Sequence, residues 1–286
     1  MRIIIISDIS GDSESIIPWG LNLGKHTGSE VDILHLIDPR EKKGVASPFG
    51  DSQSITPGEK LSPDDIRKRE EGKADRELDK LLSKEASRLN YPLKINRIIE
   101  TEKLEKKLKT LYINHPESMI LTSSDLESTV FNDLDEFLSI IVDMDMPAFM
   151  VTPGTAFFKP EKVFLLTDFS QSPNISMKYM LKWVNPFHPL VSACEVTKKM
   201  DEFIKMEIVS KTWKQKVHEY IDPSIILKTN KIKGVNYAET VIDYVERNNF
   251  GWVILPKCKK ESKKKIFSVN ITKQITESLD KPLLLY

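Results

Sequence analysis

The sequence predicts two tandem α/β domains, each built on a parallel, Rossmann-like sheet. The first observation is an internal repeat, because ISDIS at residues 6–10 recurs as LTDFS at residues 166–170, and each copy follows a run of β-forming residues. The second is that DMPAFMV at residues 145–151 matches DKPLLLY at residues 280–286, so that each repeat begins and ends with a strand. The third is the alternation of strands with helices, which implies right-handed crossovers and a sheet covered on both faces.

The order of elements is the same in both repeats. In the first, strands are expected at residues 3–6, 31–37, 93–98, 118–122 and 147–151, with helical apolar spacing at 74–89, 104–112 and 134–141. In the second, strands are expected at residues 163–166, 190–196, 224–229, 251–255 and 282–286, with helices at 203–218, 238–245 and 271–279. Each repeat therefore has about five strands. The predicted domains are residues 1–152 and 161–286, and the Pro- and Gly-containing segment 152–160 is the linker.

The first repeat is longer than the second. The equivalent residues at the start of the repeats, Asp8 and Asp168, are farther apart in the chain than those at the end, Pro147 and Pro282. The additional residues of the first repeat are expected between residues 38 and 73, where Pro and Gly cluster. A long loop without secondary structure is either functional or disordered. A plain surface excursion and a lid or partner-binding segment both remain open.

Composition limits the function classes. The chain has 286 residues, and its 42 Lys+Arg balance 42 Asp+Glu, so no net charge favours nucleic acid or an anionic membrane. No apolar run approaches the roughly 18 residues of a transmembrane helix, and no secretory leader is recognisable. Two cysteines, Cys194 and Cys258, make neither a disulfide framework nor a zinc site, so a reduced, cytoplasmic protein is expected. No Walker, dinucleotide or nucleophile-elbow motif is present, and we assign no catalytic residue and no metal ligand.

Short fragments through the whole chain carry a resemblance to a known family. They are TDFS at 167–170, Gly234 with AETVI at 238–242, WVIL at 252–255 and SV at 268–269, together with SDIS at 7–10, GSEV at 28–31, LHL at 34–36 and MIL at 119–121. In order, spacing and duplication, the chain resembles the tandem form of the universal stress protein family. The resemblance implies a stress-response or signalling role and an internal pseudo-dimer in which the strands that close the two repeats pair. Pairing would also cover two apolar strand edges.

In family members that bind ATP, the resemblance implies a G-x2-G-x9-G-[ST] loop after the fourth strand, whose amides contact phosphates. The first repeat departs from this loop, because Ser123 replaces the first glycine and Asp133 replaces the Ser/Thr. Of the family's nucleotide-binding residues, the first repeat keeps only Asp8, which follows the first strand. Acids crowd residues 123–136, which contain no Lys or Arg, and like charges repel phosphate. We expect no ATP there. Acids that stabilise a helix N-terminus are favoured over an ion site made by Asp125 and Asp133.

The loop of the second repeat is basic. Pro256, which has no N–H, and Phe267 stand at glycine positions, and six lysines between residues 257 and 265 surround one acid. Lysines could bind an anion in place of backbone amides, and a solvated basic loop is the alternative. Nucleic acid is not expected, because Phe267 alone makes no stacking platform. The candidate ligand-binding residues are Asp168, Lys257, Lys259 and Ser268.

Two functions remain open. The first is a non-enzymatic stress-response or signalling module whose nucleotide sites have decayed and which binds an unidentified protein partner. The second is a nucleotide- or anion-binding protein that uses the second repeat, with ATP or another nucleotide as ligand and slow hydrolysis as an option. No membrane partner is expected, and homo-oligomerisation stays open.

Overall fold

The computed structural model describes residues 1–7, 13–36, 63–90, 92–100, 104–125, 134–144, 146–169, 175–198, 203–257 and 269–286. Residues 1–152 are called the N-terminal half below and residues 161–286 the C-terminal half; as domain boundaries these limits stay a prediction. Residues 37–62, most of the long loop of the first repeat, lie outside the described residues. None of the described helices is long and apolar enough to cross a membrane.

Strands and helices alternate in both halves, as the sequence predicts. The N-terminal half contains β1 (Arg2–Ser7), α1 (Ser13–Thr27), β2 (Glu30–Leu36), α2 (Pro63–Leu89), β3 (Ile95–Glu100), α3 (Leu104–Asn114), β4 (Ser118–Ser123), α4 (Leu134–Met144) and β5 (Ala148–Val151). The C-terminal half contains β6 (Lys162–Leu166), α5 (Ile175–Val184), a 3-10 turn η3 (Asn185–Phe187), β7 (Leu190–Thr197), α6 (Phe203–Val217), β8 (Leu227–Lys233), α7 (Tyr237–Arg247), β9 (Trp252–Leu255), α8 (Val269–Ser278) and β10 (Leu283–Leu285).

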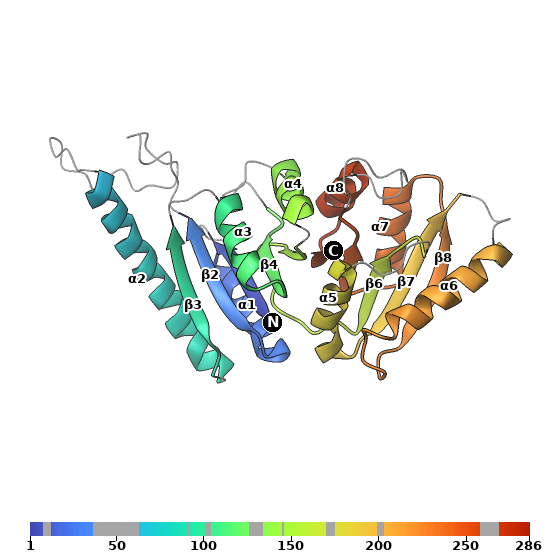
Figure 1. Ribbon diagram of the computed structural model, residues 1–286, viewed down its shortest axis with the longest axis horizontal. Helices are drawn as coiled ribbons and strands as arrows, with labels where there is room; N and C mark the ends of the chain where they lie inside the picture. The colour runs from blue at the N-terminus through green and yellow to red at the C-terminus, as the bar shows by residue number, and fades with distance from the viewer. Residues whose placement is uncertain are drawn as a thin grey trace.

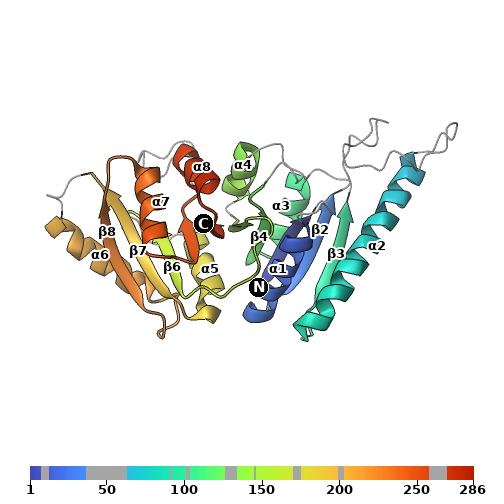
Figure 2. The ribbon, with the colours of Figure 1, turned by 180° about the vertical axis from the view of Figure 1, so that it is seen from behind.

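The strands of both halves form one continuous sheet. Within the described residues it has ten strands in the order β3-β2-β1-β4-β5-β10-β9-β6-β7-β8. Neighbours are parallel except β5 and β10, which pair antiparallel with Phe149 opposite Leu284. This pairing confirms the internal pseudo-dimer. Figure 1 shows the halves side by side, blue to green and yellow to red, and Figure 2 shows the same arrangement from behind.

Each face of the sheet is covered by two helices from each half. One apolar core contains residues of α1, α2, α5 and α6, and the other contains residues of α3, α4, α7 and α8. A parallel strand buried on both faces is apolar along its length, as in the IIII run of β1. Helix α1 approaches this strand closely at Gly20, where an added Cβ would lie 2.4 Å from Ile5 Cδ1. A larger residue at this position would require the side chains of Ile5 and Leu121 to shift.

Aromatic side chains join the halves on the face that α1 covers. Trp19 of α1, Phe149 of β5 and Trp252 of β9 are all buried, with ring centroids 4.6 Å (Trp19–Phe149), 5.0 Å (Phe149–Trp252) and 5.8 Å (Trp19–Trp252) apart. Phe157 of the linker contacts Trp19, and Phe187 of η3 contacts Trp252. We call these five residues the aromatic seam. Because its members come from both halves, the seam stabilises the arrangement set by the β5–β10 pair.

Two predictions of local structure need correction. The third strand of the second repeat was expected at residues 224–229, but β8 begins at Leu227. The carboxylate of Asp222 accepts hydrogen bonds from both the backbone N–H and the hydroxyl of Ser224, which makes a turn of this segment.

The long loop is also shorter than expected, because α2 begins at Pro63 rather than near residue 74. Proline is favoured in the first turn of a helix, and the carboxylate of Asp65 complements the helix dipole there. Residues 63–73 of the predicted loop are therefore helical.

We expect Phe149→Ala to lower the free energy of unfolding by about 3–5 kcal/mol, because a fully buried ring is lost from the centre of the aromatic seam. Chemical denaturation of the full chain measures the change. The control is Phe158→Ala, which removes an exposed ring of the linker. Equal effects of the two substitutions would contradict the central role of the seam.

Stability should fall in mildly acidic solution because of His26. Its ring stacks on Phe157 of the seam at 5.4 Å, and burial, together with the charges of Lys159 and Lys25, lowers its pKa from the ordinary 6.5. The folded state therefore binds this proton less readily than the unfolded chain does. The associated stability is full above pH 6.5 and is lost as the pH falls through the lower folded-state pKa. Thermal unfolding across this range should show less pH dependence in His26→Gln than in His218→Gln, a control at an exposed histidine.

Candidate functional site

In each half the strand order changes direction at one point, and we call the region outside the carboxyl ends of the strands at this point the crevice. In the C-terminal half β6 has β7 on one side and β9 on the other, with Leu165 in register with Ala193 and Ile254. Strand β1 has the same position between β2 and β4 in the N-terminal half. Ligands of open parallel sheets bind outside the carboxyl ends of the strands at this point. The segments after β6 and β9 thus meet at one crevice, as the sequence analysis expects.

Asp168 lies at the crevice of the C-terminal half. It follows the end of β6 and is 7% exposed. The hydroxyl of Thr167 accepts a hydrogen bond from the N–H of Phe169, whose φ is +52° and whose ring packs against Trp213 of α6. A positive φ is uncommon for a bulky residue, and such strain gathers at functional sites. The turn after β6 is therefore the local feature that most resembles a binding site.

Tyr286 spans the same crevice. It follows β10, and its hydroxyl donates to the carbonyl of Leu166, the last residue of β6, at 3.0 Å. Since β9 lies between β10 and β6, the side chain must pass over the carboxyl end of β9 to make this bond. The residue is 5% exposed, and its backbone N–H also donates to Leu255 of β9. The phenol therefore fills space that a ligand at the switch in strand order would use.

The ammonium group of Lys257 contacts the other half of the protein. Its Nζ donates to the carbonyl of Met146 at 2.8 Å and lies 3.4 Å from the carbonyl of Ile141, both near the C-terminal end of α4. A cation at a helix C-terminus is stabilised by the unpaired carbonyls and the helix dipole. The backbone N–H of Lys257 donates to the carbonyl of Tyr286. An anion in the crevice would have to compete with these contacts, so the role of Lys257 as an anion ligand stays a prediction.

The remaining sequence candidates divide between the halves. Ser123 is buried at the end of β4, and its hydroxyl accepts a hydrogen bond from the N–H of Asp125 at 3.0 Å, which is a local turn contact. Four candidates lie outside the described residues: Asp8, Asp133, Lys259 and Ser268. Of the residues predicted for the C-terminal half, the structure thus places Asp168 and Lys257 after neighbouring strands, at the same edge of the sheet.

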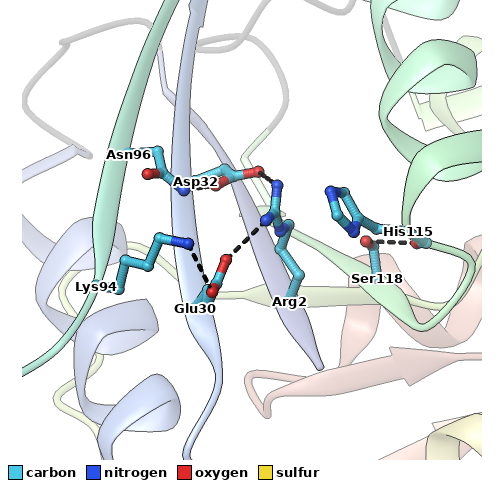
Figure 3. Close-up of polar contacts among 7 residues, drawn as sticks. All are labelled: Arg2, Glu30, Asp32, Lys94, Asn96, His115 and Ser118. Carbon is cyan, nitrogen blue, oxygen red and sulfur yellow. Dashed lines mark hydrogen bonds and ion pairs between the residues drawn. The ribbon is translucent and has the colours of Figure 1, made fainter.

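A second polar cluster, which sequence reasoning missed, lies at the amino ends of β1, β2 and β3 (Figure 3). Arg2 pairs with Glu30 at 2.7 Å and with the fully buried Asp32 at 3.0 Å. Asn96 donates to Asp32, and Lys94 pairs with Glu30. The signal for this cluster was Asp32 itself, an acid inside an apolar strand. Its charges are paired within the cluster, as a buried carboxylate requires.

This amino-end cluster borders a hollow of about 430 Å³ that is also lined by His115 and Glu117. The hollow lies at the opposite ends of the strands from the two crevices. Among the described residues no group of three or more His, Cys, Asp and Glu could hold a metal ion. Cys194 of β7 is buried, and burial raises the pKa of its thiol to about 12, so it is not a reactive thiolate.

Comparison with known proteins identifies the fold. A universal stress protein from Archaeoglobus fulgidus matches with a TM-score of 0.64 and 12% identity, over 99% of this chain and 95% of its own. A putative universal stress protein from Pseudomonas aeruginosa matches with a TM-score of 0.53 and 9% identity, over 99% and 92%. The fold is that of the universal stress proteins. No protein-family model and no curated protein matches the sequence.

The universal stress protein fold also occurs in other contexts. The cytoplasmic domain of a prokaryotic cation chloride cotransporter matches with a TM-score of 0.51 and 10% identity, over 99% of this chain and 93% of that one. At such low identity the likeness describes the arrangement of strands and helices. Function must be argued from the residues at the sites.

We expect Tyr286→Phe to lower the free energy of unfolding by about 0.5–1.5 kcal/mol, because the carbonyl of Leu166 loses its buried hydroxyl donor. Urea denaturation measures the change. The control is Tyr237→Phe, in a residue whose ring lies under Lys198 and is only partly buried. An unchanged free energy of unfolding in Tyr286→Phe would mean that the bond from the phenol to Leu166 does not hold the crevice closed.

Proposed function

We propose that this protein is a stress-response or signalling module of the universal stress protein type that works by binding a protein partner rather than by chemistry on a nucleotide. The observation that carries the proposal is the bond from the Tyr286 hydroxyl to the Leu166 carbonyl across the crevice of the C-terminal half. A buried side chain that closes the place where a ligand would sit supports a role that does not depend on one.

The N-terminal half supports the same proposal for an electrostatic reason. The first turn of α4 carries Asp135 and Glu136, both exposed, at the end of the helix where free N–H groups would favour a phosphate. Asp135 pairs with Lys273 of α8 at 3.0 Å. The positive end of the helix dipole thus faces carboxylates of its own chain. A phosphate placed there would meet like charges, whose repulsion is about 4 kcal/mol per pair at 4 Å near a protein surface.

A nucleotide or another anion in the C-terminal half is the second candidate. The turn at Asp168 and Phe169 favours it, because a buried acid and a strained backbone lie together at the switch in strand order. Binding would require the ring of Tyr286 to leave the crevice. An anion that used Lys257 would also have to draw its ammonium group away from α4.

Calorimetric titration of the full chain with Mg-ATP tests the proposal. We expect no heat of binding up to about 1 mM ligand and no nucleotide retained on purification, as read by native mass spectrometry. The full chain is needed because residues 1–152 alone would expose the apolar edge of β5.

Micromolar binding that is lost in Lys257→Glu with Lys259→Glu would contradict the proposal and support the second candidate. The matched control is Lys257→Met, which removes the contact with α4 without reversing the charge. Loss of binding in the control as well would show that the Lys257 ammonium group itself is required. Retention in the control would show that the two introduced carboxylates repel the anion.

A further inference from the structure

Strand β8 ends the sheet, and its backbone offers hydrogen-bonding groups on the outer side. The carbonyl of Ile226 accepts from Val191, and the N–H of Gly234 donates to Thr197, so even-numbered residues of this segment direct their backbone groups to β7. In a parallel ladder the alternate residues then direct theirs to the opposite side. Residues 227, 229, 231 and 233 therefore present N–H and C=O groups at the edge of the sheet, where the described residues contribute no further strand.

The side chains along this edge are apolar at its ends and basic between them. Ile226, directly before β8, is 60% exposed, and Val235, just after it, is 80% exposed. Lys228 and Lys233 are exposed between them, and within the part of the chain that the structure describes neither forms an ion pair. Isolated lysines commonly protect an edge strand from aggregation. Exposed apolar side chains at both ends do not serve that purpose.

A groove runs beside the edge. Helix α7 lies next to β8 (Figure 1), and a hollow of about 400 Å³ between them is lined by Ile232, Lys233, Val235, Asn236, Glu239, Thr240, Asp243, Tyr244 and Arg247. The two acids of this lining belong to α7, and Asp243 pairs with Arg247 on the same helix, so the basic side chains that face an added strand are those of β8. Ile232 and Tyr244 are partly buried against the apolar core of this face. Side chains of a strand added to β8 would point alternately into this groove and away from it.

The opposite edge of the sheet differs. Arg97 of β3 pairs with Asp75 and Asp79 of α2, and Lys94 just before β3 pairs with Glu30. The positive charge at that edge is thus neutralised within the chain, whereas Lys228 and Lys233 at β8 have no such partners among the described residues.

We propose that an extended, acidic segment of a partner protein adds to β8 as a further strand. Main-chain hydrogen bonds to the outward groups of β8 supply affinity, and side chains supply specificity. Its acids face Lys228 and Lys233, and apolar side chains near its two ends contact Ile226 and Val235. Strand β8 has seven residues, so the segment spans about 23 Å. This assignment rests on the proposed role as a partner-binding module and names the surface that binds.

Fluorescence anisotropy with the full chain tests it. The probe is a labelled synthetic peptide of about nine residues with a Leu at each end and Glu-Glu and Val-Val pairs between them, so that both faces of the added strand carry acids for Lys228 and Lys233. We expect saturable binding that weakens as salt rises, because exposed charges are screened. The same peptide with Lys in place of Glu should not bind. The acidic peptide N-methylated at alternate amides should bind at least about tenfold more weakly, because it loses main-chain donors.

Variants of β8 locate the site. Thr229→Pro removes an outward N–H without removing a bond to β7, and we expect about tenfold weaker binding, against no change in Thr229→Val. Lys228→Glu with Lys233→Glu should also weaken binding about tenfold. The matched control is Lys73→Glu with Lys84→Glu, which makes the same change in net charge on exposed positions of α2. Thermal unfolding reports whether Thr229→Pro folds. If it does not fold, the Lys228→Glu, Lys233→Glu variant decides whether the peptide binds at β8.

Equal binding of acidic and basic peptides, or binding unchanged by either β8 variant, would overturn the assignment. So would tighter binding of a single-stranded oligonucleotide, or sedimentation showing that a second copy of the chain occupies this edge. These outcomes are separate from the Mg-ATP titration. Nucleotide binding would remove the proposed function while leaving the β8 result intact, and absence of peptide binding would leave the titration result intact.

Discussion

The antiparallel pairing of β5 with β10 is the constraint on which the rest of the structure depends. Both strands are short and fully buried, and either one left unpaired would expose a row of backbone donors and acceptors beside an apolar surface. Their pairing turns two half-sheets into one and brings Trp19 against Phe149 and Trp252 on one face. On the other face it brings α4 against α8, where Asp135 pairs with Lys273.

The same pairing connects the junction between the halves to the crevice of the C-terminal half. Tyr286 directly follows β10 and Lys257 follows β9, so the strands at the junction also carry the two side chains that govern the crevice. The hydroxyl of Tyr286 bonds to β6, and the ammonium group of Lys257 bonds to α4 of the other half. A ligand entering this crevice would meet one contact within the C-terminal half and one contact between the halves.

Among the described strands, joining the half-sheets removes two edges and leaves two, β3 and β8. The two edges differ in charge. At β3, acids of α2 pair with Arg97, whereas at β8 exposed lysines lie between the exposed Ile226 and Val235. A fold shared with a transporter's cytoplasmic domain as well as with stress proteins does not fix a function. The difference between its edges comes from this chain's own residues, and it is the observation on which the proposed partner-binding surface at β8 rests.

The sequence by itself determined the repeat and the alternation of strands and helices, because these follow from local apolar patterns such as the runs of β1 and β10. The pairing of the two closing strands was expected from the family resemblance, and its antiparallel direction came from the structure. It also placed Asp168 at the end of a strand beside the crevice. It misplaced the start of β8, where the turn held by Asp222 is a side-chain effect that apolar spacing does not report. Only the tertiary structure decided what Tyr286 and Lys257 do. Their partner carbonyls, on Leu166 and Met146, lie 120 and 111 residues away in the chain, and no local pattern encodes a contact made across the folded sheet.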